Sequence, residues 1–138
     1  MKRKIRLLCC GSRDWSDYEV VFSWLKHLHE KYIIDVIIEG EAQGADTLSK
    51  RAGRKLGIPI LPFKAQWKKF GRAAGPIRNQ EMLHHGKPTM AIAFHKALKK
   101  SKGTKDMVER LEKKGIKVFK VKRKYESKRV GRDSSTES

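Results

Sequence analysis

Glycine, serine and threonine recur beside charged side chains at four places in the chain. These segments are Gly11–Trp15 (GSRDW), Glu39–Asp46 (EGEAQGAD), Gly71–Gln80 (GRAAGPIRNQ) and Ser101–Thr104 (SKGT). Small residues let backbone N–H groups approach an anion closely, above all at the start of a helix. Arginine side chains can add paired contacts to phosphate or carboxylate oxygens. Together the four segments predict a site for an anionic ligand such as a nucleotide.

The predicted contacts divide by chemistry. At one expected helix start, Gly40, Gly44 and Ala45 leave room for a phosphate or a ribose. At another, Gly103 and Thr104 offer backbone N–H groups and a hydroxyl. The full set of predicted ligand-binding residues is Gly11, Ser12, Arg13, Asp14, Gly40, Gly44, Ala45, Asp46, Arg72, Arg78, Asn79, Ser101, Gly103 and Thr104.

The charged residues of this set are each assigned the ligand group that their charge would attract. Arg13, Arg72 and Arg78 are candidates for phosphate or carboxylate contacts. Asp46 would repel a phosphate, so a ribose hydroxyl is its expected partner. Two structural alternatives stay open, because Asp46 can serve only the helix dipole and the glycines can serve only turns.

Five short apolar runs are expected to position these segments. They are rich in Ile, Val and Phe and resemble buried parallel strands. The runs are Ile5–Cys10, Ile33–Ile38, Ile58–Phe63, Thr89–Phe94 and Ile116–Val121. Helical patterns lie between them, which predicts a single α/β domain with a mainly parallel five-stranded sheet and helices on both faces. The four polar segments then follow the carboxyl ends of strands, where ligands bind in such sheets.

Local sequence signals indicate where the helices begin and where the alternation of strands and helices is interrupted. Ser16–Glu19 has the pattern of a capping box, Pro76 suits a first helical turn, and Thr104 can cap a fourth helix. Lys64–Gly75 is predicted to be a longer loop. Residues 1–122 are predicted to form the domain, followed by a basic, polar and disordered tail at 123–138.

The amino-acid composition limits the classes of partner that the protein is expected to bind. Lys and Arg number 33 against 15 Asp and Glu, a formal net charge of +18, which favours nucleotides and, non-specifically, nucleic acid. No apolar run approaches the roughly 20 residues of a membrane span, and the adjacent pair of cysteines is no disulfide framework. We therefore expect a cytoplasmic protein without a membrane partner. The chain has no GxxxxGK[ST] motif, so ATP hydrolysis of that type is not indicated.

Other candidate constellations are weaker. The five histidines have no zinc spacing, so no metal is predicted and surface or helix-face positions are favoured for them. Glu39 and Glu41 could supply acid–base chemistry, but solvated acids at a strand end are the favoured interpretation. Trp15, Trp67 and Phe70 could stack on a base, although tryptophans in a domain of this size are more often core or pocket wall.

The motifs GSRDW, EGEAQGAD, GRAAGPIRNQEML and AFH…SKGTKDMV resemble the YspA/YpsA-related branch of the SLOG superfamily, over about Ile5 to Val118. The resemblance implies a Rossmann-like, doubly wound fold with strand order 3-2-1-4-5. It also implies a pocket for a nucleotide or nucleotide-derived ligand, ADP-ribose-like for instance, in a sensor or accessory role. A phage or bacterial origin and a capacity to form homo-oligomers are further implications.

Two better-known relatives supply the alternatives. Ile77–Gln80 and Gly103-Thr104 are similar to motifs of the LOG-type phosphoribohydrolases, which implies a nucleotide N-glycoside hydrolase. The acidic residue of the LOG pattern falls on Met107, however, and Asp106 comes one position early, where a helix would point it elsewhere; this departure favours binding over cleavage. Glu39–Asp46 and Arg78–Gln80 look like patterns of the DNA-processing protein DprA, which implies binding of single-stranded nucleic acid. Whether the chain is an enzyme stays open at this point.

Overall fold

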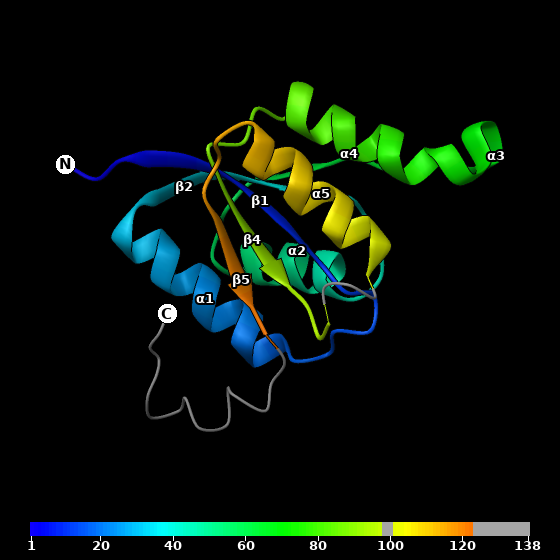
Figure 1. The fold of residues 1–138 in the computed structure, drawn as a ribbon. Coiled ribbons are helices and arrows are strands. Elements are labelled where there is room, and N and C mark those ends of the chain that lie inside the picture. The colour runs from blue at the N-terminus through cyan, green and yellow to red at the C-terminus, as the bar shows by residue number, and fades with distance from the viewer. Residues whose placement is uncertain (98–100, 123–138) are drawn as a thin grey trace.

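The computed structural model describes residues 1–97 and 101–122 (Figure 1). The predicted tail, 123–138, lies outside these residues. Strands and helices alternate along the chain, as the apolar runs predict. The elements are β1 (Lys4–Gly11), α1 (Tyr18–Lys31), β2 (Ile33–Glu39), α2 (Ala45–Lys55), β3 (Ile60–Pro62), α3 (Trp67–Phe70), the 3₁₀ turn η1 (Gly71–Ala73), α4 (Ala74–His84), β4 (Met90–Phe94), α5 (Lys102–Lys113) and β5 (Val118–Val121).

The sheet has the order β3-β2-β1-β4-β5, and every neighbouring pair of strands is parallel. The predicted fold class and the predicted strand order are therefore confirmed. β1 is central, with β2 on one side and β4 on the other (Figure 1). The chain reverses its direction of winding next to β1, and the carboxyl ends of β1 and β4 flank that reversal.

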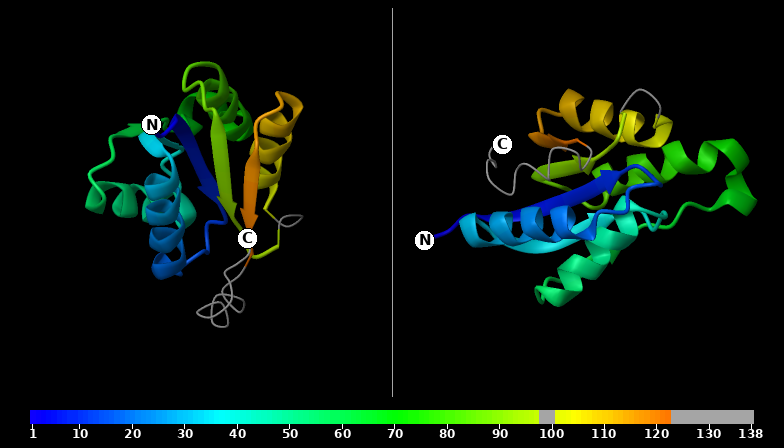
Figure 2. Two further views of the ribbon diagram at one scale, coloured as in Figure 1. Left: turned by 90° about the vertical axis from the view of Figure 1, so that its left-hand side faces the viewer. Right: turned by 90° about the horizontal axis from the view of Figure 1, so that it is seen from below.

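Helices cover both faces of the sheet (Figure 2). One core cluster includes Leu7, Leu25 and Ile37 and lies between the sheet and the α1–α2 layer. The other includes Leu8, Ile38 and Leu111 and lies between the sheet and the α4–α5 layer. Alternate residues of a strand point to opposite faces, so successive residues of β1 divide between the two clusters. No helix within the described ranges is long and apolar enough to cross a membrane.

β3 and β5 are shorter than their apolar runs. β3 covers Ile60–Pro62 where Ile58–Phe63 is predicted. Pro59 and Pro62 have no N–H to donate, and proline is tolerated in strands mainly at a sheet edge. β3 is such an edge strand. Its pairing continues through isolated bonds, since the Ile37 amide donates to the Pro59 carbonyl at 2.9 Å.

Two predicted helix caps are each displaced. α1 has its cap at Asp17, one residue after the predicted Ser16, and the Asp17 carboxylate accepts from the Val20 amide at 3.2 Å. α5 begins at Lys102, so Thr104 lies within its first turn, where its hydroxyl accepts from the Ser101 hydroxyl at 2.8 Å. In both cases a neighbouring polar side chain occupies the capping position.

The predicted loop over Lys64–Gly75 is wrong. This segment contains α3 and η1 and runs directly into α4. Its residues lack the apolar spacing of a buried helix, and α3 indeed buries none of its side chains. α3 lies beyond the end of α4 and projects from the fold (Figure 1). The consequence is a short exposed helix beside the carboxyl edge of the sheet.

Candidate functional site at the carboxyl edge of the sheet

Two glycines let the end of β1 lie against its neighbours. A Cβ at Gly11 would collide with the carbonyl oxygen of Phe94, and one at Gly44 would collide with that of Ser12. Gly44 also has a φ of 75°, which favours glycine. As a result, the Ala45 amide donates to the Ser12 carbonyl at 3.1 Å. The predicted opening for a phosphate at Ala45 is therefore revised, because its N–H group is already paired inside the protein.

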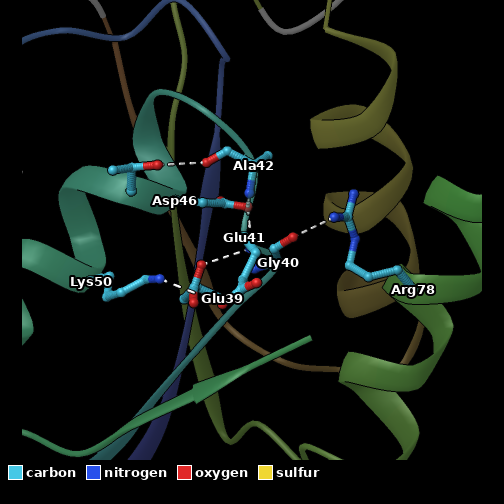
Figure 3. Close-up of polar contacts among 8 residues, drawn as sticks. Glu39, Gly40, Glu41, Ala42, Asp46, Lys50 and Arg78 are labelled. Atoms are coloured by element: carbon cyan, nitrogen blue, oxygen red, sulfur yellow. Dashed lines mark hydrogen bonds and ion pairs between the residues drawn. The ribbon is translucent and has the colours of Figure 1, made fainter. Parts of the chain in front are cut away.

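Asp46 organises the loop between β2 and α2. Its Oδ2 accepts from the amides of Gly40 at 3.2 Å and Ala42 at 3.1 Å (Figure 3). The residue is 6% exposed, and burial raises the pKa of its carboxyl to about 6 against the opposing effect of these bonds and of Arg78. No hydrogen bond within the described ranges involves Oδ1. Asp46 thus holds the loop with one oxygen and keeps the other available.

Arg78 reaches the same loop from α4. Its Nη1 donates to the Gly40 carbonyl (Figure 3). Its Nε donates to Asn79 Oδ1 at 3.0 Å. Asn79 in turn donates through Nδ2 to the Gly103 carbonyl at 3.2 Å and to Asp106 at 3.0 Å. Both predicted ligand residues therefore connect structural elements: Arg78 joins α4 to the β2–α2 loop, and Asn79 joins α4 to α5.

A cavity of about 1030 Å³ opens at this edge, between the loop after β1, the start of α4 and the start of α5. All the predicted ligand residues line it except Gly40, Gly44 and Ala45. Those that do are Gly11, Ser12, Arg13, Asp14, Asp46, Arg72, Arg78, Asn79, Ser101, Gly103 and Thr104. Gly40 is excluded because Arg78 lies against it, and the other two support the end of β1. Bringing residues from such distant segments together fits the expected use of the sheet edge.

The charges in the cavity do not cancel. Asp14 forms an ion pair with Lys96 at 3.5 Å, and Asp106 pairs with Arg110 at 2.8 Å. Arg13, Arg72 and Lys102 also line the cavity, and no ion pair to them occurs within residues 1–97 and 101–122. The cavity therefore has a surplus of unpaired cations.

The α5 side adds uncharged donors. Amides in the first turn of a helix have no partner within the helix, and the first-turn residues Lys102, Gly103 and Thr104 line the cavity. The floor carries Cys10, whose thiol pKa burial raises well above its ordinary value, so it is held as the neutral thiol. The cavity can consequently bind an anion but offers no activated thiolate.

Glu39 departs from the prediction of a solvated acid. It is fully buried. Its Oε1 accepts from the Glu41 amide at 2.7 Å, while Oε2 is buried and has no partner in the described part of the chain. Burial raises the pKa of this carboxyl to about 7. Glu39 shares the face of β2 with Ile37, which belongs to the core cluster on the α1–α2 side. It therefore points away from the cavity and does not line it.

His95 is likewise neither on the surface nor on a helix. It follows β4, is 4% exposed and, among residues 1–97 and 101–122, has no hydrogen-bond partner at either ring nitrogen. Burial, with Lys122 and Lys120, lowers the pKa of its imidazole. Within the part of the chain that the structure describes, no group of three or more His, Cys, Asp or Glu side chains could hold a metal ion.

Several cavity residues fall outside the predicted set, among them Lys96, Lys102, Asp106 and Trp67. Lys96 lies two residues after the end of β4, so its position after a parallel strand was a usable signal. Asp106 lines the cavity although it was expected to point elsewhere, because its carboxylate is directed toward α4, where Oδ2 accepts from Asn79 Nδ2. Trp67 also lines the cavity and is 49% exposed. It was weighed for base stacking, but its segment lacked a predicted structure that would have placed it.

Comparison with known proteins gives three results. The model of the YspA, cpYpsA-related SLOG family matches residues 5–70. The Gene 61 protein of Mycobacterium phage D29 is 34% identical over 120 residues, which cover 83% of this chain and 94% of that protein. DNA processing protein A (DprA) from Streptococcus pneumoniae has a similar fold, with a TM-score of 0.67 and 19% identity over 86% of this chain. This chain corresponds to 50% of the DprA chain.

Proposed function

Because the chain belongs to the YspA, cpYpsA-related SLOG family, we propose that its cavity binds a nucleotide or a nucleotide-derived ligand, ADP-ribose-like for instance. The observation that carries the proposal is the surplus of unpaired cations around a cavity of about 1030 Å³. A cavity of that size is at the upper end of the range for small-molecule sites. Its polar groups come from several elements, so they can contact different parts of one ligand.

The proposed contacts follow the free groups of the cavity. Phosphate groups interact with the first turn of α5 and with Arg72 and Lys102, where unpaired amides and positive charge coincide. A ribose hydroxyl donates to Oδ1 of Asp46, the oxygen that the loop does not use. Arg78 and Asn79 act indirectly by keeping the β2–α2 loop and α5 in place.

Binding rather than cleavage is proposed because of Met107 and Asp106. The LOG pattern has its acid where this chain has Met107, an apolar side chain that is 1% exposed. Asp106 is held by Arg110 and Asn79. A carboxylate engaged in this way is a poor match for a group that must exchange protons with substrate or water.

The test begins with native mass spectrometry of the purified protein, to detect a retained small molecule, and continues with calorimetric titration of AMP and ADP-ribose. Arg72→Ala removes an unpaired cavity cation and should weaken nucleotide binding about 10-fold or more. Arg54→Ala is the matched control, because it removes the same exposed charge from the opposite end of α2. Equal affinity of the Arg72→Ala variant and the parent would contradict the proposed phosphate position.

Binding of single-stranded nucleic acid is a second candidate. The observation that favours it is a stretch without any acidic residue, 47–80, which includes the basic segment around α3. If six or more phosphates are contacted, raising salt from 50 to 200 mM should lower the affinity for an oligonucleotide by about 10³-fold. Fluorescence anisotropy of a labelled oligothymidylate measures this, and an affinity insensitive to salt would contradict an electrostatic interface.

A further inference from the structure

Trp67 differs from the other two tryptophans in its surroundings. Trp15 is 3% exposed and packs on Phe94, with ring centroids 5.7 Å apart. Trp24 packs on Phe119 at 5.5 Å. Trp67 is 49% exposed, begins the projecting helix α3 and lines the cavity. Its indole is thus an apolar surface that the fold leaves largely uncovered, next to a polar cavity.

Arg13 approaches the same indole from the loop after β1. Its Cζ lies 5.8 Å from the centroid of the Trp67 ring system, close to the roughly 6 Å limit of a cation–π contact. Arg13 is exposed, and within the described residues it forms no hydrogen bond or ion pair. The guanidinium is therefore free to move relative to the ring.

The spacing of these two groups suits an aromatic ring between them. Stacked carbon atoms lie about 3.5–4 Å apart, so a ring held between two flat groups needs about 7–8 Å. The present separation would have to widen by only about 1–2 Å, which a rotation of the Arg13 side chain can supply. Both flat groups also attract a nucleobase, because the guanidinium stacks on aromatic rings and indole–base stacking is favourable whatever the base.

We infer that Arg13 and Trp67 form a clamp that stacks on the two faces of an unstacked nucleobase. This inference rests on the proposed function, since the clamp places the base of a ligand whose phosphates lie at the start of α5. It goes further by naming which ligand chemistry the site selects: a phosphorylated ribose with an aromatic base binds better than the same sugar phosphate without one. The base can belong to a free nucleotide or to the end of a single strand.

The experiment compares AMP with ribose 5-phosphate by calorimetry and follows tryptophan fluorescence. In the parent, AMP should bind more tightly than ribose 5-phosphate and should quench the emission of the exposed Trp67. Trp67→Ala should weaken AMP binding by about 5- to 150-fold and leave ribose 5-phosphate binding unchanged. Trp67→Phe should restore most of the AMP affinity, and Arg13→Lys, which keeps the charge but loses the flat guanidinium, should weaken AMP selectively.

The outcomes separate the two proposals. If the parent and Trp67→Ala prefer AMP over ribose 5-phosphate by the same ratio, the clamp is overturned while the cavity remains a sugar phosphate site. If AMP, ribose 5-phosphate and a 5′-phosphorylated oligothymidylate all fail to bind, both proposals are overturned. Tighter binding of AMP identifies a free nucleotide as the source of the base, and tighter binding of the oligothymidylate at the same salt identifies a strand end.

Discussion

The starts of α2 and α5 look alike in sequence but differ in how their polar groups are used. Both lie at the carboxyl edge of the sheet and have a glycine close to the first helical residue, Gly44 before α2 and Gly103 within the first turn of α5. At the start of α2, the Ala45 amide bonds to Ser12 and the Asp46 carboxylate bonds to the loop before it. At the start of α5, the first-turn residues line a cavity that also has unpaired cations among the described residues. The start of α2 is thus paired within the fold, whereas the start of α5 borders the cavity that we propose as a ligand site.

The difference teaches that a glycine-rich helix start is not by itself evidence of anion binding. What decides its role is whether another segment of the chain already occupies the amides. The end of β1 does so at α2, because Gly11 and Gly44 allow close approach of the backbones. Substitutions at the α2 start should therefore change stability first, and substitutions around the cavity should change binding first.

The largest effect is expected from Asp46→Ala. It leaves the buried amide of Gly40 and the partly buried amide of Ala42 without an acceptor. Since an unpaired buried amide costs about 1–3 kcal/mol, the free energy of unfolding should fall by about 2–5 kcal/mol, as measured by urea denaturation. Asp35→Ala, at an exposed carboxylate of β2, is the control and should be within about 0.5 kcal/mol of the parent. A loss that small in Asp46→Ala would show that the loop does not depend on this carboxylate.

Glu39, at the end of β2, should make the free energy of unfolding depend on pH. Its pKa is raised from an ordinary 4.5 to about 7, so the folded state prefers the neutral acid. The corresponding stability is present below pH 4.5 and is lost as the pH rises through 7. Between pH 5 and 8 the parent should lose on the order of 1–3 kcal/mol more than the Glu39→Gln variant, which cannot ionise. Identical pH profiles from urea denaturation would contradict a neutral buried Glu39.

Arg78→Ala should combine the two kinds of effect. It removes the donor to the Gly40 carbonyl and to Asn79 Oδ1 at a half-buried position. We expect a loss of about 1–2 kcal/mol in stability together with weaker nucleotide binding, because the β2–α2 loop and its Asp46 lose their anchor. Arg72→Ala, at an exposed position, should lose binding alone. If Arg78→Ala keeps full stability and loses only affinity, Arg78 contacts the ligand directly.

Much of the fold could be predicted from the sequence. The apolar runs predict the strands because a strand covered on both faces needs nearly continuous Ile, Val and Leu. Their alternation with helical patterns predicts the parallel sheet. The wrong predictions concern α3 and the length of β3, where the local residue pattern does not indicate the structure. α3 has no apolar periodicity, and the proline-bounded β3 is short because its pairing depends on the neighbouring strand.

The site could be predicted only in part. Residue type and position after a strand predict that Arg13, Arg72 and Thr104 gather at one edge, which they do. The same information cannot say that the Ala45 amide is already paired or that Glu39 is buried. Those contacts depend on how closely segments far apart in the chain approach each other, and a single sequence does not show these distances.

The smallest expected effect has the opposite sign. Asp14 pairs with Lys96 at 3.5 Å, with Asp14 mostly exposed, so the pair contributes little to stability. Asp14→Asn removes a negative charge from the cavity and frees Lys96 for the ligand. AMP affinity should therefore rise about 2- to 5-fold at low salt, with the free energy of unfolding unchanged within about 0.5 kcal/mol. The gain should shrink at high salt, because exposed charges are screened. Calorimetric titration at 20 and 300 mM salt measures the gain in AMP affinity and its decrease with salt. A weaker affinity in Asp14→Asn would mean that Asp14 itself accepts a hydrogen bond from the ligand.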